Sequence, residues 1–148
     1  MRVALRQRRH AVRREHAQGR RVAAPARLIE ARGEDLQRDD LARGELHAER
    51  YVVPDQTVAR IAETRARGGR VIAVGTTSAR TLESATVGRV PVAGPGITRL
   101  FVRPPYRFRA IDGLITNFHL PKTSLLMLVG ALGGRERLLA AYAEAVQT

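Results

Sequence analysis

Two patterns of apolar spacing alternate in the middle of the chain, and this alternation restricts it to folds that combine strands with helices. Residues 50–53 and 71–74 are short runs of strand-forming residues, and the second has the β-branched composition of a buried strand. Between them, apolar residues recur at helical spacing from Asp55, which is placed to cap a helix, to a pair of glycines that would end it. A second helix is predicted at residues 80–86. The expected fold class is therefore α/β, with a mixed sheet flanked by helices.

The second half of the chain shows the same mixture in shorter pieces. Glycine and proline are dense in residues 88–98, which predicts a loop. Further short strands are predicted at residues 100–102, 108–111 and 114–116. Pro121 suits the first turn of a helix because its missing N–H would be unpaired there, and the apolar residues that follow predict a buried helix. A last amphipathic helix is expected from the spacing of Leu138, Leu139, Tyr142 and Val146.

The composition excludes several classes of protein. Cysteine is absent, which rules out disulfides, zinc–thiolate sites and a thiol nucleophile. The four histidines lack the spacing of a zinc site, so no metal is expected. No apolar run reaches the roughly 18 residues that a membrane helix needs, and no apolar segment follows the first charges as in a secretory signal. We expect a cytoplasmic protein without a membrane partner, taken as a monomer by default.

Arginine is concentrated at the start of the chain. Residues 1–32 hold ten arginines and two acidic residues, a net charge of +8, out of +12 for the whole chain. Arginine-rich arms bind nucleic acid because they neutralise phosphates and release counterions. An unstructured tail, or sequence outside the natural reading frame, fits these residues better because their apolar positions show no period. We therefore divide the chain into an Arg-rich arm, residues 1–38, and a folded part, residues 39–148.

A turn ahead of a predicted helix carries the first candidate binding residues. Thr76, Thr77 and Ser78 follow a strand, so free backbone N–H groups at the positive end of the helix would suit a carboxylate or phosphate. Thr77 or Ser78 would cap the helix, and Arg80 would add a bidentate contact to the anion. An ordinary capped turn with a solvated arginine explains the same residues equally well.

Two further segments carry candidate catalytic residues. Asn117 and His119 share one face if the chain is extended between them, and a histidine at a strand end serves as an acid or base near neutral pH. Lys122 lies at an expected helix start, where an anion is favoured. Ahead of the first strand, His47 and Glu49 form a pair that would project to one side. From spacing alone, a core-edge histidine and ordinary surface residues are the favoured interpretations.

Five segments of the folded part occur in a definite order. They are GELHAERYVVP at Gly44–Pro54, GGRVIAVGTTSARTLES at Gly68–Ser84, PPYRFRAIDG at Pro104–Gly113, LITNFHLPKTSLLMLV at Leu114–Val129 and GRERLLAAYAEAV at Gly134–Val146. Together they resemble the S-adenosylmethionine:tRNA ribosyltransferase-isomerases of queuosine biosynthesis. Five ordered blocks are far more specific than a single motif, so the chain is identified as a member of this family.

The resemblance implies an enzyme that moves the ribosyl part of S-adenosylmethionine onto 7-aminomethyl-7-deazaguanine in the wobble position of tRNA. The product is epoxyqueuosine, and adenine and methionine are released. S-adenosylmethionine is thus a consumed co-substrate, and tRNA is the partner. The implied catalytic residues are His119, Glu49 and His47. The implied substrate-binding residues are Thr76, Thr77, Ser78, Arg80, Asn117 and Lys122.

The sequence also departs from the family pattern. The resemblance covers residues 40–147, and the block expected ahead of it is not recognisable in residues 1–38. A further stretch is expected after Thr148. The chain is therefore expected to be a C-terminal portion of the enzyme, incomplete relative to the full-length fold and unable to turn over alone. Two alternatives stay open, a basic tRNA-binding module without chemistry and an inactive gene remnant.

Overall fold

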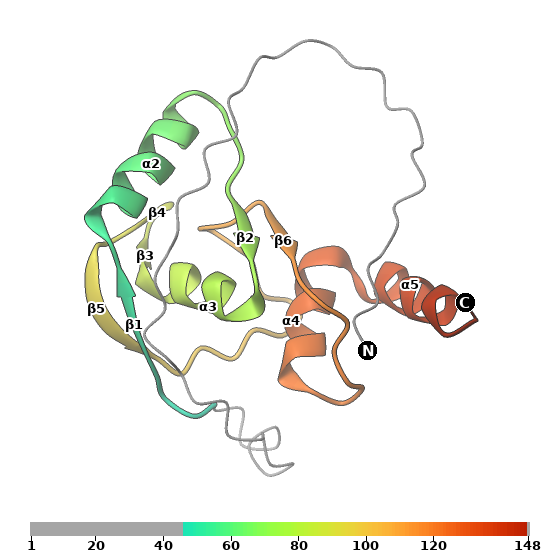
Figure 1. The fold of residues 1–148 in the computed structure, drawn as a ribbon. Helices are drawn as coiled ribbons and strands as arrows, with labels where there is room; N and C mark the ends of the chain where they lie inside the picture. Colours follow the sequence, from blue (N-terminus) through green and yellow to red (C-terminus); the bar gives the residue numbers. More distant parts are fainter. Residues whose placement is uncertain (1–45, 148) are drawn as a thin grey trace.

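A computed structural model describes residues 46–147 of the chain (Figure 1). Its strands and helices are β1 (Glu49–Val53), α2 (Asp55–Ala66), β2 (Ile72–Val74), α3 (Thr76–Ala85), β3 (Thr86–Val87), β4 (Val90–Pro91), β5 (Gly94–Thr98), β6 (Gly113–Ile115), α4 (Ser124–Gly133) and α5 (Arg135–Gln147). The predicted arm, residues 1–38, and its boundary lie outside the described residues. Between residues 46 and 147, no helix is both long and apolar enough to cross a membrane.

Strand pairing confirms the α/β class. β1 pairs with β5 and β3 with β4, both antiparallel, whereas β2 and β6 run parallel. Both kinds of pairing expected of a mixed sheet are present, and they are distributed over three two-stranded sheets. The parallel pair aligns Ile72 with Gly113 and Val74 with Ile115, so it joins two halves of the chain that are far apart in sequence.

The central element of the described fold is α3. It contacts β2, β1, β5 and β4, and therefore touches strands of all three sheets. Figure 1 shows α3 between the β1–β5 pair and the β2–β6 pair. Its residues Ala79 and Leu82 belong to an apolar cluster that is completed by Ile61, Ala73, Ala110 and Ile111. Because α3 is enclosed in this way, its polar side chains Arg80 and Glu83 are buried and need partners.

The loop predicted at residues 88–98 is wrong. β4 and β5 occupy most of this stretch, and β5 pairs along the whole length of β1. Gly96 lies directly opposite Tyr51, and a side chain at residue 96 would collide with the tyrosine ring. Gly96, one of the glycines on which the loop prediction depended, instead lets β1 and β5 approach closely.

The start of α3 differs from the predicted one. The helix begins at Thr76 and not at residue 80, and its N-cap is Gly75, so neither Thr77 nor Ser78 caps it. Gly75 has a φ of 89°, a left-handed value that glycine adopts without a steric penalty. The polar turn predicted between strand and helix is therefore the first turn of the helix itself.

The starts of α2 and α4 also differ from the predicted ones. Pro54 is the N-cap of α2, and Asp55 is already inside the first turn, where its charge suits the helix dipole. Thr123 is the N-cap of α4, and its side chain accepts a hydrogen bond from the N–H of Leu126. Pro121 therefore lies outside the helix that it was predicted to begin.

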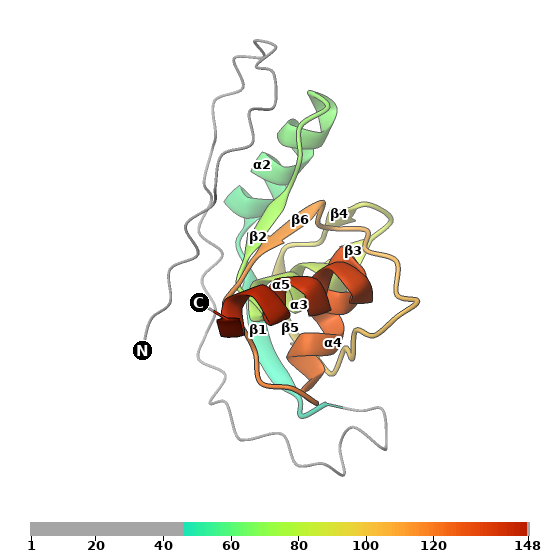
Figure 2. The same ribbon diagram turned by 90° about the vertical axis from the view of Figure 1, so that its right-hand side faces the viewer.

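Some apolar residues are more exposed than their spacing suggests. Ile72 and Val74 of β2 are 42% and 69% exposed, so the prediction of a buried strand is correct only for Ala73. In α5 no residue is buried, and Leu139 and Val146 are 50% and 85% exposed. Figure 1 shows α5 at the edge of the described fold beside α4, away from the β1–β5 pair, and in Figure 2 the same helix is nearest the viewer.

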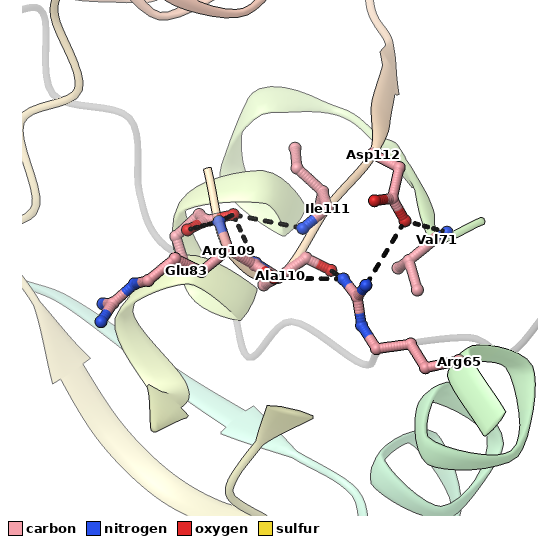
Figure 3. Close-up of polar contacts among 7 residues, drawn as sticks. All are labelled: Arg65, Val71, Glu83, Arg109, Ala110, Ile111 and Asp112. Carbon is pink, nitrogen blue, oxygen red and sulfur yellow. Dashed lines mark hydrogen bonds and ion pairs between the residues drawn. The ribbon is translucent and has the colours of Figure 1, made fainter. Parts of the chain in front are cut away.

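The carboxylate of Glu83 holds residues 109–111 against α3 (Figure 3). It accepts hydrogen bonds from three consecutive backbone N–H groups of this segment, at distances between 2.9 and 3.2 Å, and one from the hydroxyl of Tyr106 at 3.0 Å. Glu83 is only 1% exposed. The strand predicted at 108–111 is wrong because these N–H groups bind a carboxylate and not a neighbouring strand. The strand predicted at 100–102 is absent as well.

Arg65 of α2 secures the same segment from its carbonyl side (Figure 3). Its guanidinium donates to the carbonyl oxygens of Arg109 and Ala110 at 3.1 and 2.7 Å and lies 3.7 Å from the carboxylate of Asp112. Asp112 accepts a hydrogen bond from the N–H of Val71 at 2.8 Å, and its own N–H donates to the carbonyl of Val71. These contacts join α2, α3 and the start of β2, and so they place β6 alongside β2.

The substitution Glu83→Gln should destabilise the fold, because an amide has one acceptor oxygen and would place N–H donors against N–H donors. We expect the free energy of unfolding to fall by about 3 kcal/mol, measured by urea denaturation. Glu63→Gln is the matched control, since Glu63 pairs with Arg67 at the surface, where the two side chains are 67% and 69% exposed. Equal unfolding midpoints for the two variants would contradict the role of Glu83.

Candidate binding site around Arg80 and His119

β1 and α3 bring Glu49 and Arg80 together. Nη1 of Arg80 donates to Oε1 of Glu49 at 2.7 Å, and its Nε donates to the carbonyl of Leu100 at 3.0 Å. The side chain of Arg80 is 6% exposed and that of Glu49 is 26% exposed. Arg80 is therefore not the solvated arginine of an ordinary turn. It is a buried cation whose charge is balanced by a carboxylate from another element.

This ion pair keeps unused hydrogen-bonding capacity. Nη2 of Arg80 and Oε2 of Glu49 are buried, and neither has a hydrogen-bond partner within residues 46–147. Buried polar atoms are nearly always paired, so an open donor and an open acceptor at one ion pair point to a further polar group, from a ligand or from water. A group that offers both an acceptor and a donor, such as a sugar hydroxyl, would satisfy them.

The start of α3 provides backbone donors near this pair. The first N–H groups of a helix have no partner inside the helix, and no side chain caps α3, so none of them is occupied by a cap. Thr76 is buried, whereas Thr77 and Ser78 are partly exposed. The N–H of Gly75 donates to the carbonyl of Ile115 at 2.8 Å, which ties this turn to the end of β6. Anion binding at this helix start stays a prediction.

His119 lies in the loop between β6 and α4, where a side chain of the same loop and one of α5 contact it. Its Nε2 is 3.0 Å from Oγ1 of Thr116. Its backbone N–H donates to the hydroxyl of Tyr142 at 2.6 Å, and that hydroxyl donates to the carbonyl of His119 at 2.9 Å. Burial lowers the pKa of His119 below its ordinary value of 6.5. The imidazole is therefore neutral at pH 7 and able to accept a proton.

The other predicted site residues are exposed. Asn117 and Lys122 lie on the same loop as His119, and Lys122 has a φ of 62°, a left-handed value that is uncommon outside glycine. His47 is exposed ahead of β1, whereas Glu49 contacts Arg80, so the two members of this predicted pair have different surroundings. In the described part of the chain, no cluster of His, Asp and Glu residues could hold a metal ion.

Sequence reasoning missed the polar network around Glu83. Burial, and after it the negative charge and hydrogen bond of Glu83, together raise the pKa of Tyr106 to about 12. One signal was available, because Glu83 follows Arg80 by three residues and therefore lies on the same face of α3. If this face of α3 also packs against the rest of the fold, the charged groups of Arg80 and Glu83 are both buried there, and each needs a polar partner.

The fold and these contacts define a class of protein, an α/β domain whose candidate polar groups are a helix start, a buried Arg–Glu pair and a histidine loop. Comparison with known proteins identifies the family. The chain belongs to the queuosine biosynthesis protein family, whose model matches residues 31–148.

Relatives in this family are similar to the chain over most of its folded part. An S-adenosylmethionine:tRNA ribosyltransferase-isomerase from Pelotomaculum thermopropionicum is 60% identical over 110 residues, which are 73% of this chain and 32% of that protein. One from Anaeromyxobacter dehalogenans is 55% identical over 122 residues, 82% of this chain and 34% of that protein. The crystal structure of S-adenosylmethionine tRNA ribosyltransferase from Thermotoga maritima matches with a TM-score of 0.60 and 48% identity, over 67% of this chain and 35% of that one. The chain thus spans about a third of the length of these relatives.

The lowered pKa of His119 predicts how stability depends on pH. Below pH 6.5 the unfolded chain binds a proton at this histidine more readily than the folded chain does, so the folded state should lose stability as the pH falls through this value. We expect the ring of His119 to titrate below pH 6.5 by NMR in the folded chain. The urea-unfolded chain is the reference, since free histidine titrates at about 6.5. A midpoint at or above the reference would mean that the ring is not buried in solution.

Proposed function

We propose that this chain acts in the transfer and isomerisation of the ribosyl group of S-adenosylmethionine onto 7-aminomethyl-7-deazaguanine in the wobble position of tRNA, giving epoxyqueuosine. The observation that carries the proposal is the identity of 60% over 110 residues with a protein named S-adenosylmethionine:tRNA ribosyltransferase-isomerase. A substrate of this kind also implies a cytoplasmic site of action. S-adenosylmethionine is the co-substrate, and no metal takes part in the proposed chemistry.

The reaction makes three demands on the site. A base must remove a proton next to the sulfonium, an acid must help adenine to leave as its bond to the sugar breaks, and polar groups must hold the sugar hydroxyls and the methionine carboxylate. Methionine leaves when the carbon–sulfur bond breaks. His119, with its neutral imidazole, suits the base, and Glu49 and His47 remain the candidates for the other proton transfers.

The binding groups divide by charge. The carboxylate of methionine suits the open N–H groups at the start of α3, near Thr77 and Ser78, because they carry the positive end of the helix dipole. Arg80 contributes to the field at this anion, but its charge is balanced by Glu49, so its open Nη2 also suits a neutral sugar oxygen. Lys122 is exposed and would reach a tRNA phosphate.

Because the chain spans about a third of its relatives, we propose that it supplies part of the substrate site and does not turn over by itself. A nucleoside assay tests this. The chain is incubated with S-adenosylmethionine and tRNA that carries the aminomethyl-deazaguanine, and the digested tRNA is searched for epoxyqueuosine by mass spectrometry, with a full-length relative in parallel. Product from the chain would place the full catalytic set within it. No product, with the relative active, is the expected result.

Binding provides a test that does not need turnover. The chain should bind S-adenosylmethionine in a calorimetric titration, and Asn117→Ala should weaken this binding about fivefold, the loss of one hydrogen bond to the sugar. Asn117 is exposed, so the substitution should leave the fold unchanged. Arg89→Ala, at an exposed position of the β3–β4 turn, is the control and should bind as the unchanged chain does. A folded chain that binds no S-adenosylmethionine would refute the proposal.

A second candidate function, a basic tRNA-binding module without chemistry, is favoured by the net charge of +8 in residues 1–32. It predicts that replacing Arg8, Arg9, Arg13 and Arg14 by Ala weakens tRNA binding and flattens its dependence on salt. The logarithmic slope should fall by up to about 0.7–0.9 for each phosphate that is no longer neutralised. Filter binding at several salt concentrations measures both. An unchanged affinity and slope would make this region irrelevant to tRNA binding.

A further inference from the structure

α5 contributes few apolar contacts to the fold, yet one of its side chains reaches a candidate catalytic residue. No residue of α5 is buried, and its apolar residues Leu139 and Val146 are 50% and 85% exposed. The ring of Tyr142 meets that of Phe118 edge-on, with the ring centroids 4.8 Å apart, and its hydroxyl lies against the backbone of His119. A helix with so little apolar burial is placed by specific contacts more than by a shared core.

The hydroxyl of Tyr142 uses both of its hydrogen-bonding roles on a single residue. It accepts from the N–H of His119 at 2.6 Å and donates to the carbonyl oxygen of the same residue at 2.9 Å. Loop backbone groups normally bind water or several different partners. Here both backbone polar groups of one residue converge on one side-chain oxygen, which restricts the rotation of the peptide units on either side of His119.

The rest of the loop is held independently of Tyr142. Nε2 of His119 lies 3.0 Å from Oγ1 of Thr116, and Oγ1 of Thr123 donates to the carbonyl of Leu120 at 2.8 Å. Lys122, between Leu120 and Thr123, adopts a left-handed φ of 62°. Non-glycine residues in that region are strained and persist where surrounding contacts enforce them. The loop is thus fixed at its two ends and, through Tyr142, at the backbone of His119 itself.

We propose that Tyr142 is a positioning residue: its hydroxyl fixes the backbone of His119, and α5 thereby sets the direction in which the imidazole is presented to the substrate. The proposal rests on the role of His119 as a base in the proposed function. Tyr142 touches no reacting atom and acts only through His119. α5 is accordingly a support for the His119 loop and not merely a terminal helix.

The variant Tyr142→Phe tests the proposal, because it removes the hydroxyl and keeps the ring that contacts Phe118. We expect the backbone amide of His119 to exchange with solvent about tenfold faster by NMR. The ring nitrogen signals of His119 should also shift, a change that a general loss of stability would not produce. Leu139→Ala, an exposed substitution on the same helix, is the control and should change neither. Unchanged exchange and unchanged ring signals in Tyr142→Phe would overturn the proposal.

The titration with S-adenosylmethionine adds a functional readout. If Tyr142 acts through His119, then Tyr142→Phe should weaken binding in the otherwise unchanged chain and add no further loss to His119→Ala. Additive losses would mean that Tyr142 has an independent role, which contradicts the proposal. Failure of the unchanged chain to bind would refute the proposed function alone, since exchange and ring signals still decide the role of Tyr142.

A folding defect would not leave the question open. If Tyr142→Phe does not fold, the unchanged chain is measured by itself. The amide of His119 should then exchange at least about tenfold more slowly than that of exposed Asn117 on the same loop. Equal exchange at the two amides would overturn the proposal, because an amide bound to the Tyr142 hydroxyl must be protected.

Discussion

The described fold depends on a carboxylate placed where there is almost no water. Glu83 is 1% exposed in the middle of α3, and a charge in that position is tolerated only with several donors around it. It obtains them from the backbone of residues 109–111 and the hydroxyl of Tyr106. The same hydrogen bonds also serve the segment that donates them. They hold residues 109–111 to α3, although this segment belongs to no sheet.

The position of β6 follows from that contact. Arg65 and Asp112 complete the attachment of the segment, to α2 on one side and to Val71 at the start of β2 on the other. Gly113 then enters β6 directly opposite Ile72, and the parallel pairing continues to Ile115. The two-stranded parallel sheet is therefore a consequence of polar contacts at its entrance, and its apolar face is left partly exposed, with Val74 and Ile115 at 69% and 61%.

The candidate site is attached to the same helix. Arg80 lies one turn before Glu83 on α3, so one element carries both the carboxylate that organises the fold and the guanidinium that belongs to the site. The hydrogen bond from the N–H of Gly75 to the carbonyl of Ile115 joins the start of α3 to the end of β6. The loop that carries His119 begins at the next residue. A substitution that weakens the hydrogen bonds of Glu83 is therefore expected to change the surroundings of both Arg80 and the His119 loop.

The sequence alone determined the α/β class, the approximate places of β1, α2, α3, β6, α4 and α5, and the family, because these depend on local spacing and on ordered motifs. It could not reveal β5, since glycine and proline predict a loop unless the partner strand and Tyr51 are known. It singled out Arg80 and His119 but not what they touch. Whether Arg80 is solvated or paired with Glu49, and whether Glu83 is a surface charge or the centre of the fold, depends on residues distant in sequence. Only the tertiary structure decides these contacts. A buried polar group needs a hydrogen-bonding partner, and the fold determines which distant residue is close enough to be that partner.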